Sequence, residues 1–228
     1  MPDAIMLFAA GFGTRMGALT ADRPKPLIEV AGRALLDHAL DLAEAHGPLR
    51  KVVNAHYRAE QIEMHLAGRD VAVSIEEPDI LDTGGGLRAA LPLLGANPVF
   101  TLNTDAIWSG PNPLDLLADA WDPARMDALL LCVPLARAIG RQGGGDFRID
   151  ADVRLTRGGD LVYSGAQILK TGGLADIPET VFSLNLLWNR MAQADRLCGL
   201  TYPGTWCDVG RPDGIPLAES LLAGRSDV

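Results

Sequence analysis

Short apolar runs and segments with helical spacing alternate along the chain. The apolar run at residues 4–10 (AIMLFAA) is typical of a strand buried on both faces of a parallel sheet. Residues 35–45 instead carry apolar side chains at helical spacing, and a Gly-Pro pair follows at residues 47–48. The first pattern predicts a strand and the second predicts a helix.

The same two patterns recur as far as residue 133. They predict further strands at residues 51–55, 71–75, 99–102 and 128–133, and further helices at residues 59–66, 87–91 and 114–120. Alternating strands and helices imply right-handed crossovers, so we expect an α/β fold with a Rossmann-like, mostly parallel central sheet flanked by helices. A ligand of such a sheet binds beyond the carboxyl ends of the strands.

Beyond residue 143 the pattern changes to short strands and glycine-rich turns. Strands are predicted at residues 153–156, 161–162 and 164–169, with the turn-forming sequence RGGD at residues 157–160. We expect a small antiparallel excursion that forms a wall beside the ligand. Farther along, GTWCDVG precedes a helix that is predicted to run through residue 222.

Composition and charge limit the class of protein and its partners. The 228 residues are 48% hydrophobic, and no repeat or long linker divides them, so we expect a single domain over residues 1–228. With 20 basic and 29 acidic residues the net charge is −9. Nucleic acid is therefore not an expected partner, because binding to its phosphate backbone needs a positive face.

The cysteines and the N-terminus indicate a cytoplasmic protein. Cys132, Cys198 and Cys207 form no CxxC pair, and we expect reduced, buried thiols. The first apolar run ends at a glycine and is too short for a signal peptide or a membrane span, so no membrane partner is expected. The four histidines are expected to be structural.

The loop after the first predicted strand suits phosphate. Gly11 and Gly13 lack Cβ atoms, so the backbone can adopt positive φ and bring N–H groups against a ligand, and Arg15 adds a cation. Lys25 stands between two prolines, a rigid setting that suits a charge aimed at one point. A Walker P-loop is excluded because no GK[ST] ends the loop, and a dinucleotide-binding fingerprint would need glycine where Met16 stands.

Two aspartates are candidates for binding a metal ion or phosphate. Asp105 follows the predicted strand at residues 99–102, which places its carboxylate over the ligand crevice, although an Asx turn is the alternative. Asp208 lies between Trp206 and Val209, which are expected core residues, and its burial there would be costly unless it meets a cation.

Three consecutive glycines at residues 84–86 precede the predicted helix at residues 87–91. They place bare N–H groups at a helix N-terminus that the Thr83 side chain can cap. A flexible turn is the alternative explanation.

These motifs together resemble the nucleotidyltransferase family that joins sugar 1-phosphates to nucleoside triphosphates. That family has a strand ending in AAGxGTRM followed by PKPL, and this chain has AAGFGTRM at residues 9–16 and PKPL at residues 24–27. The resemblance continues in order through TGGG, NTD and WCDVG and covers residues 9–222. Thr104 replaces the glycine usual in the family.

The resemblance implies a role for each matching residue. The residues implied to bind the nucleotide are Gly11, Gly13, Thr14, Arg15, Lys25, Thr83, Gly84, Gly85 and Asn103. Magnesium is implied on Asp105 and Asp208, which with Arg15 and Lys25 form the implied catalytic set. The candidates for contact with the sugar are Asp146, Gly165 and Gln167.

The implied reaction is in-line attack of a sugar 1-phosphate oxygen on the α-phosphorus of a nucleoside triphosphate, with release of pyrophosphate. No protein nucleophile is needed, because the attacking phosphate is already an anion. The expected partners are thus a nucleoside triphosphate and a sugar 1-phosphate, and the expected assembly is a monomer or small homo-oligomer.

Within the family, the compact length and the segments GGGDFR and YSGAQIL look most like members that transfer uridylyl from UTP to N-acetylmuramate 1-phosphate in cell-wall recycling. A mannose 1-phosphate guanylyltransferase is the nearest alternative. An NAD(P)-dependent oxidoreductase, which would not require Lys25, and a non-catalytic nucleotide-binding module stay open as other classes. A sugar carboxylate would need a cation, for which the candidates are Arg141, Arg148 and Arg190, unless these arginines are solvated or paired with nearby aspartates.

Overall fold

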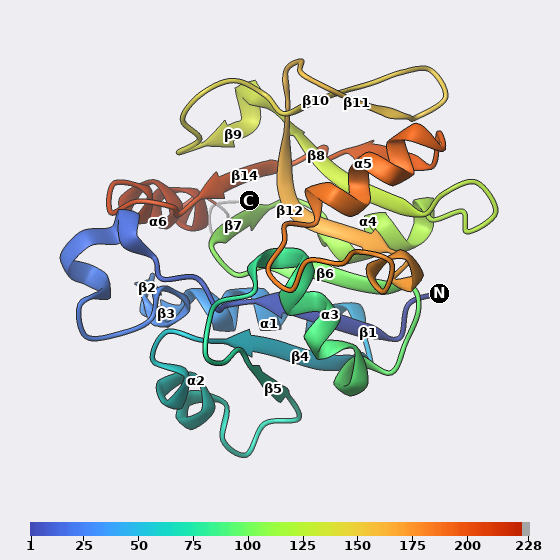
Figure 1. The fold of residues 1–228 in the computed structure, drawn as a ribbon. Coiled ribbons are helices and arrows are strands. Elements are labelled where there is room, and N and C mark those ends of the chain that lie inside the picture. Colours follow the sequence, from blue (N-terminus) through green and yellow to red (C-terminus); the bar gives the residue numbers. More distant parts are fainter. Residues whose placement is uncertain (225–228) are drawn as a thin grey trace.

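A nine-stranded sheet forms the centre of the computed structural model, which describes residues 1–224 (Figure 1). Its strands in chain order are β1 (Ala4–Phe8), β4 (Arg50–Ala55), β5 (Ala72–Ile75), β6 (Val99–Asn103), β8 (Ala128–Pro134), β10 (Phe147–Ile149), β11 (Leu155–Arg157), β12 (Leu161–Leu169) and β13 (Leu197–Thr201). Their order across the sheet is β5-β4-β1-β6-β12-β8-β13, and β10 and β11 extend from β12.

The strands that come first in the sequence form a parallel half of the sheet, as predicted. β1 pairs in parallel with β4 on one side and with β6 on the other, and β4 pairs in parallel with β5. The chain therefore leaves β1 toward one edge and later returns to its opposite side. This is a topological switch point, where open α/β sheets leave a crevice for a ligand.

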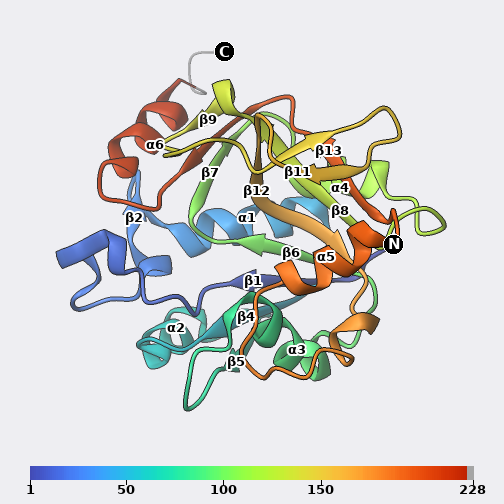
Figure 2. The same cartoon turned by 45° about the horizontal axis from the view of Figure 1, so that its top comes forward.

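Helices cover both faces of the sheet, as Figures 1 and 2 show. In β1, Ile5 and Leu7 join the core beneath α1 (Leu35–His46), α2 (Ala59–Leu66) and α4 (Pro113–Ala120). The alternate residues Ala4 and Met6 join the core beneath α3 (Asp82–Leu94) and α5 (Asn185–Gln193). Apolar residues on both faces of one strand explain the continuous apolar run in the sequence.

A smaller sheet carries the end of the chain back to the crevice. β14 (Thr205–Asp208) lies between β7 (Ala106–Ser109) and β9 (Ala138–Ile139), and α6 (Gly214–Ala223) packs against it. A third hydrophobic cluster, which includes Met16, Cys207 and Val209, fills the space between them. A short hairpin of β2 (Glu29–Val30) and β3 (Arg33–Ala34) follows η2 (Lys25–Leu27) in the sequence.

The antiparallel part differs from the prediction. The segments expected at residues 161–162 and 164–169 form one nine-residue strand, β12, which lies within the main sheet and pairs antiparallel with both β6 and β8. The register with β8 shifts between Tyr163 and Gln167, and Gly165 adopts φ 87° at this irregularity. The expected excursion is thus reduced to β10 and β11, and the wall expected beside the ligand continues the central sheet.

Other predictions concern burial and membranes. The three cysteines are buried and free, and burial raises the pKa of Cys132 to about 12 and that of Cys207 to about 11, so both thiols stay protonated. Trp206 and Val209 are core residues, as predicted. Within residues 1–224, no helix has the length and apolar character needed to cross a membrane.

Candidate functional site

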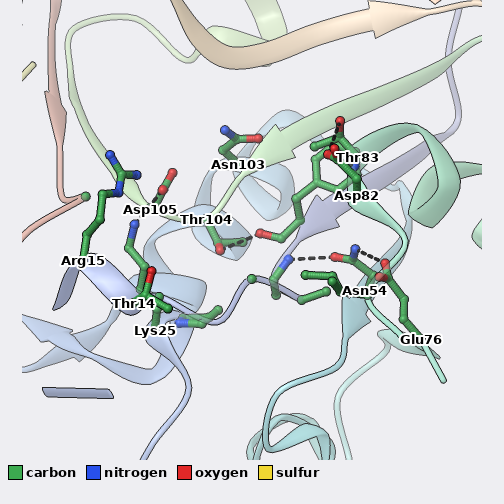
Figure 3. Close-up of a pocket in the computed structure, with 18 residues that line it drawn as sticks. Thr14, Arg15, Lys25, Asn54, Glu76, Asp82, Thr83, Asn103, Thr104 and Asp105 are labelled. Carbon is green, nitrogen blue, oxygen red and sulfur yellow. Dashed lines mark hydrogen bonds and ion pairs between the residues drawn. The ribbon is translucent and has the colours of Figure 1, made fainter. Parts of the chain in front are cut away.

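A cavity of about 310 Å³ opens at the switch point, beyond the carboxyl ends of β1 and β6. Its walls come from the loop after β1, the start of η2, the turn between β6 and β7 and the loop between β5 and α3 (Figure 3). The predicted nucleotide-binding residues that line it are Gly11, Gly13, Thr14, Arg15, Lys25, Thr83 and Asn103. Asp105 lines it too.

One end of the cavity is charged. Lys25 donates from Nζ to Asp105 Oδ2 at 2.7 Å, and their side chains are 11% and 31% exposed. Gly13 adopts φ 64°, and a Cβ there would lie 2.8 Å from Lys25 Cβ. Glycine at position 13 therefore allows the loop to bend and Lys25 to pack against it, whereas Gly11 takes no positive φ.

The second predicted metal ligand reaches the same end from the smaller sheet. β14 pairs with β7 so that Asp208 lies opposite Ala106, and Val209 N donates to Asp105 O at 2.9 Å. Burial and the Asp105 carboxylate raise the pKa of Asp208 above its usual range, although Lys25 and Arg15 act in the opposite direction. The structure thus brings together two carboxylates and two cations that the sequence separates widely.

These two carboxylates are the candidate cation ligands. Within the described part of the chain, no group of three or more His, Cys, Asp or Glu side chains is placed to hold a metal ion. Magnesium commonly takes only one or two protein carboxylates and completes its coordination with water and substrate phosphates. Asp105 and Asp208 fit that kind of site.

The other end of the cavity contains a buried polar bridge that sequence reasoning missed. Asn54 Oδ1 accepts from Ala9 N at 2.7 Å, and Asn54 Nδ2 donates to Glu76 Oε1 at 2.6 Å (Figure 3). Glu76 is 1% exposed, and its Oε2 accepts from Leu81 N at 2.7 Å. The bridge fixes β1, β4 and the start of α3 around the cavity. The available signal was Asn54, a polar residue directly after the apolar pair Val52 and Val53 of a predicted strand.

The role predicted for the three glycines needs correction. The α3 helix begins at Asp82, five residues earlier than expected, and Thr83 lies inside its first turn and does not cap it. Gly84 N and Gly85 N donate to Phe182 O at 2.9 and 3.1 Å, and neither residue lines the cavity. A Cβ at any of the three glycines would overlap neighbouring atoms, so they allow close packing against the segment near Phe182 and against Glu76.

The three residues predicted to contact the sugar lie in different environments. Gln167 is fully buried, donates to Thr101 Oγ1 and accepts from Trp188 Nε1, both at 3.0 Å, so it is a core residue and that prediction is wrong. Gly165 lies against the Asn103 side chain, at the edge of the cavity. Asp146 accepts from Arg141 Nη2 at 2.8 Å and from Tyr163 N at 2.9 Å, so it positions neighbours in this structure.

Thr104, which replaces the glycine usual in the family, and the four histidines lie outside the set of predicted site residues. Thr104 is 3% exposed and donates from Oγ1 to Phe8 O at 2.8 Å, which ties the β6–β7 turn to the end of β1. None of the four histidines lines the cavity, and each contacts a backbone carbonyl or an aspartate, as expected of structural residues: His38, His46, His56 and His65. The carbonyl that His56 contacts belongs to Glu76, a residue of the cavity wall.

Comparison with known proteins decides the family. A model of the MobA-like NTP transferase domain matches residues 5–139, more than half of the chain. The chain belongs to this family. Its sequence is 43% identical to that of N-acetylmuramate alpha-1-phosphate uridylyltransferase from Caulobacter vibrioides, over 97% of this chain and 98% of that protein.

A second relative and a solved structure are consistent with this assignment to the NTP transferase family. The protein of the same name from Neisseria meningitidis serogroup B is 30% identical, over 95% of this chain and 96% of its own length. HddC from Yersinia pseudotuberculosis superposes with a TM-score of 0.77 at 21% identity, covering 96% of this chain and 99% of HddC, which shows a shared fold. The predicted fold class and the predicted nucleotidyltransferase are confirmed, and the alternatives of another class are set aside.

Proposed function

We propose that this protein transfers the uridylyl group of UTP to N-acetylmuramate 1-phosphate in the cytoplasm, with magnesium, as a step in the recycling of cell-wall sugars. The observation that carries the proposal is the 43% identity to the Caulobacter uridylyltransferase, which extends over nearly the whole of both chains. The charged end of the cavity supports it, because this reaction needs charge neutralisation around phosphates rather than a protein nucleophile.

The residues at the charged end of the cavity have separate roles in binding the triphosphate and in positioning the reacting groups. Gly11, Gly13 and Thr14 offer backbone N–H groups and a hydroxyl to the triphosphate, and the exposed Arg15 adds a guanidinium that can bind phosphate oxygens in pairs. Lys25 packs against Gly13 of this loop, with its ammonium already directed at Asp105. When substrates bind, Lys25 exchanges this carboxylate for phosphate oxygens and holds the reacting groups in line.

Asp105 and Asp208 would hold the magnesium ion. The raised pKa of Asp208 has burial and the like charge of Asp105 as its two main causes, so a divalent cation would remove the repulsion between these groups. Bound there, Mg²⁺ would supply positive charge to the α-phosphate and to the incoming sugar phosphate.

A panel assay of pyrophosphate release tests the proposal. The four nucleoside triphosphates are each supplied with N-acetylmuramate 1-phosphate, N-acetylglucosamine 1-phosphate and mannose 1-phosphate, with Mg²⁺ or with EDTA. We expect the highest kcat/KM for UTP with N-acetylmuramate 1-phosphate, and no turnover in EDTA. A preference for GTP with mannose 1-phosphate would refute the proposed substrates and favour the guanylyltransferase alternative.

A further inference from the structure

A second, smaller cavity shares Arg15 with the cavity at the switch point and is lined by Asp208 as well. Its volume is about 120 Å³, enough for a group of several non-hydrogen atoms, because a buried water needs only about 10–15 Å³. Three arginines, Arg15, Arg141 and Arg211, line it together with two aspartates, Asp208 and Asp213. In a chain of net charge −9, this is a local concentration of cations.

The backbone fixes Arg141 beside the proposed metal ligand. β9 runs parallel to β14, with Ile139 paired to Cys207. The residues that follow, Gly140 and Asp208, therefore lie next to each other. Gly140 adopts φ 74°, and a Cβ there would lie 2.6 Å from Asp208 O. Only glycine fits this close approach, which delivers Arg141 to the cavity wall.

Arg141 has hydrogen-bonding capacity that the protein itself does not use. Its Nη2 donates to Asp146 at 2.8 Å, and the other oxygen of Asp146 accepts from Tyr163 N, so Asp146 holds the guanidinium in place. Its Nε is buried without a partner, one of two such side-chain atoms in residues 1–224, the other being Trp206 Nε1. Because Arg141 Nε has almost no accessible surface, a ligand would meet the other donors of Arg141 instead. A guanidinium has five N–H donors, and only one of them is used by Asp146, so Nη1 and the second Nη2 hydrogen stay available to an acceptor in the cavity.

The balance of charge favours an anion in this cavity. Asp208 belongs to the proposed metal site and Arg15 to the proposed triphosphate site. Asp146 already pairs with Arg141, so Asp213 is the one lining carboxylate left for Arg211, which makes no ion pair with any residue among 1–224. A cation bound to Asp208 would make the charge around the cavity net positive.

We infer that Arg141, with Arg211, binds a carboxylate carried by the sugar substrate. The inference rests on the proposed function, under which this group is the lactyl carboxylate that distinguishes N-acetylmuramate from N-acetylglucosamine. Under that function the 1-phosphate would lie at the cation held by Asp105 and Asp208, and Asp208 also lines this cavity, so a sugar bound there would extend toward Arg141 and Arg211. A carboxylate leaving water needs such partners, and the arginine fork matches its geometry.

The structure selects Arg141 from the three arginines predicted from the sequence. Arg148 is exposed on β10, and Arg190 on α5 donates to Asp176 O at 3.2 Å; neither lines this cavity. Arg148 is therefore a matched control from the same segment of the chain.

The test compares two sugars in three variants. Arg141→Met, Arg211→Met and Arg148→Met are assayed with UTP and either N-acetylmuramate 1-phosphate or N-acetylglucosamine 1-phosphate, which lacks the lactyl group. Arg141→Met should lower kcat/KM for the first sugar roughly 10- to 100-fold, mainly through KM, and leave the second sugar unaffected. Arg211→Met should act in the same direction by roughly 3- to 10-fold, since it is exposed, and Arg148→Met should change neither value.

A substrate whose lactyl carboxylate is converted to an amide completes the test. The wild-type enzyme should lose about as much on this analogue as Arg141→Met loses on the acid, and Arg141→Met should lose little more. The inference would be overturned if Arg141→Met lowered kcat/KM equally for both sugars. It would also be overturned if Arg141→Met lowered kcat/KM for the amide as strongly as it does for the acid. Either result would leave the proposed function intact. A wild-type enzyme that prefers mannose 1-phosphate overturns both. If Arg141→Met lacks a cooperative thermal transition, Arg211→Met with the amide decides the question.

Discussion

Replacing Lys25 by alanine separates two contributions of one side chain, to folding and to turnover. Breaking a fully buried ion pair costs about 3–5 kcal/mol. Lys25 and Asp105 are 11% and 31% exposed, so water screens part of the charge left behind, and we expect a loss of about 1–2 kcal/mol in the free energy of unfolding. For a chain of this length that is a fall in Tm of about 2–8 °C.

The expected effect on turnover is larger. Loss of one cation that binds the charge building up on the phosphates should lower kcat at least ~100-fold, which corresponds to about 2.7 kcal/mol. Lys25→Arg should recover only part of this, because a planar guanidinium does not reproduce a compact ammonium in a space that Gly13 bounds closely.

Lys170 provides the matched control. The chain has only three lysines, and Lys170 donates to Asp127 at 2.9 Å outside the cavity, with exposures of 32% and 28%. Lys170→Ala should lower Tm by no more than Lys25→Ala does, because Arg196 stays paired with Asp127 at 2.8 Å, and it should not change kcat. Both variants are compared by thermal unfolding and by steady-state pyrophosphate release at saturating substrates. If Lys25→Ala keeps near-normal kcat, or loses no more than Lys170→Ala, Lys25 has no part in catalysis.

Three further predictions follow from the same structure. Asp105→Asn and Asp208→Asn should each raise the Mg²⁺ concentration needed for half-maximal activity, and the double variant should lose less than the two single losses combined, because the carboxylates act as one unit; a Mg²⁺ titration unchanged in Asp208→Asn would contradict this. Gly86→Ala should destabilise the fold by about 1–3 kcal/mol, since its Cβ would overlap Glu76 Oε1, whereas Gly172→Ala, with nothing within 4 Å, should be neutral; equal Tm values for the two would refute the packing argument. Burial raises the pKa of Asp127, but hydrogen bonds from its two basic neighbours lower it by more, so the native state binds fewer protons there. The contribution of the Asp127 carboxylate to the free energy of unfolding is then complete above the unfolded pKa of about 3.9 and lost as the pH falls through the lower native pKa. The difference in urea midpoint between wild type and Asp127→Asn should therefore shrink toward about pH 3. A difference that grows as the pH falls would contradict this direction of the pKa shift.

The sequence predicted those parts of the site that depend on local chemistry. The loop after β1, the bend at Gly13 and the rigid setting of Lys25 are each encoded within a few residues. The position of Asp105 follows from the parallel order of strands, which the alternation of strands and helices already implied.

What the sequence did not predict depends on packing between distant segments. Gln167 lies on a strand whose two neighbours in the sheet, β6 and β8, are far from it in the chain, and only this pairing shows that its amide is buried. Likewise Glu76 is a charged residue that the sequence places in a loop, and only its partner Asn54 accounts for its burial. Local propensity carries no information about such pairings.

The two carboxylates of the proposed metal site are synthesised at different times, because Asp105 and Asp208 lie far apart in the chain. β1, β4 and β6 leave the ribosome with Lys25 and Asp105 before β14 brings Asp208. Asp105 thus has a cationic partner available before its like-charged neighbour arrives. Docking of β14 must then overcome repulsion between the two carboxylates, and burial of Trp206 and Cys207 on that strand offsets it. β14, the last strand of the described residues, therefore brings the second carboxylate of the proposed cation site into place.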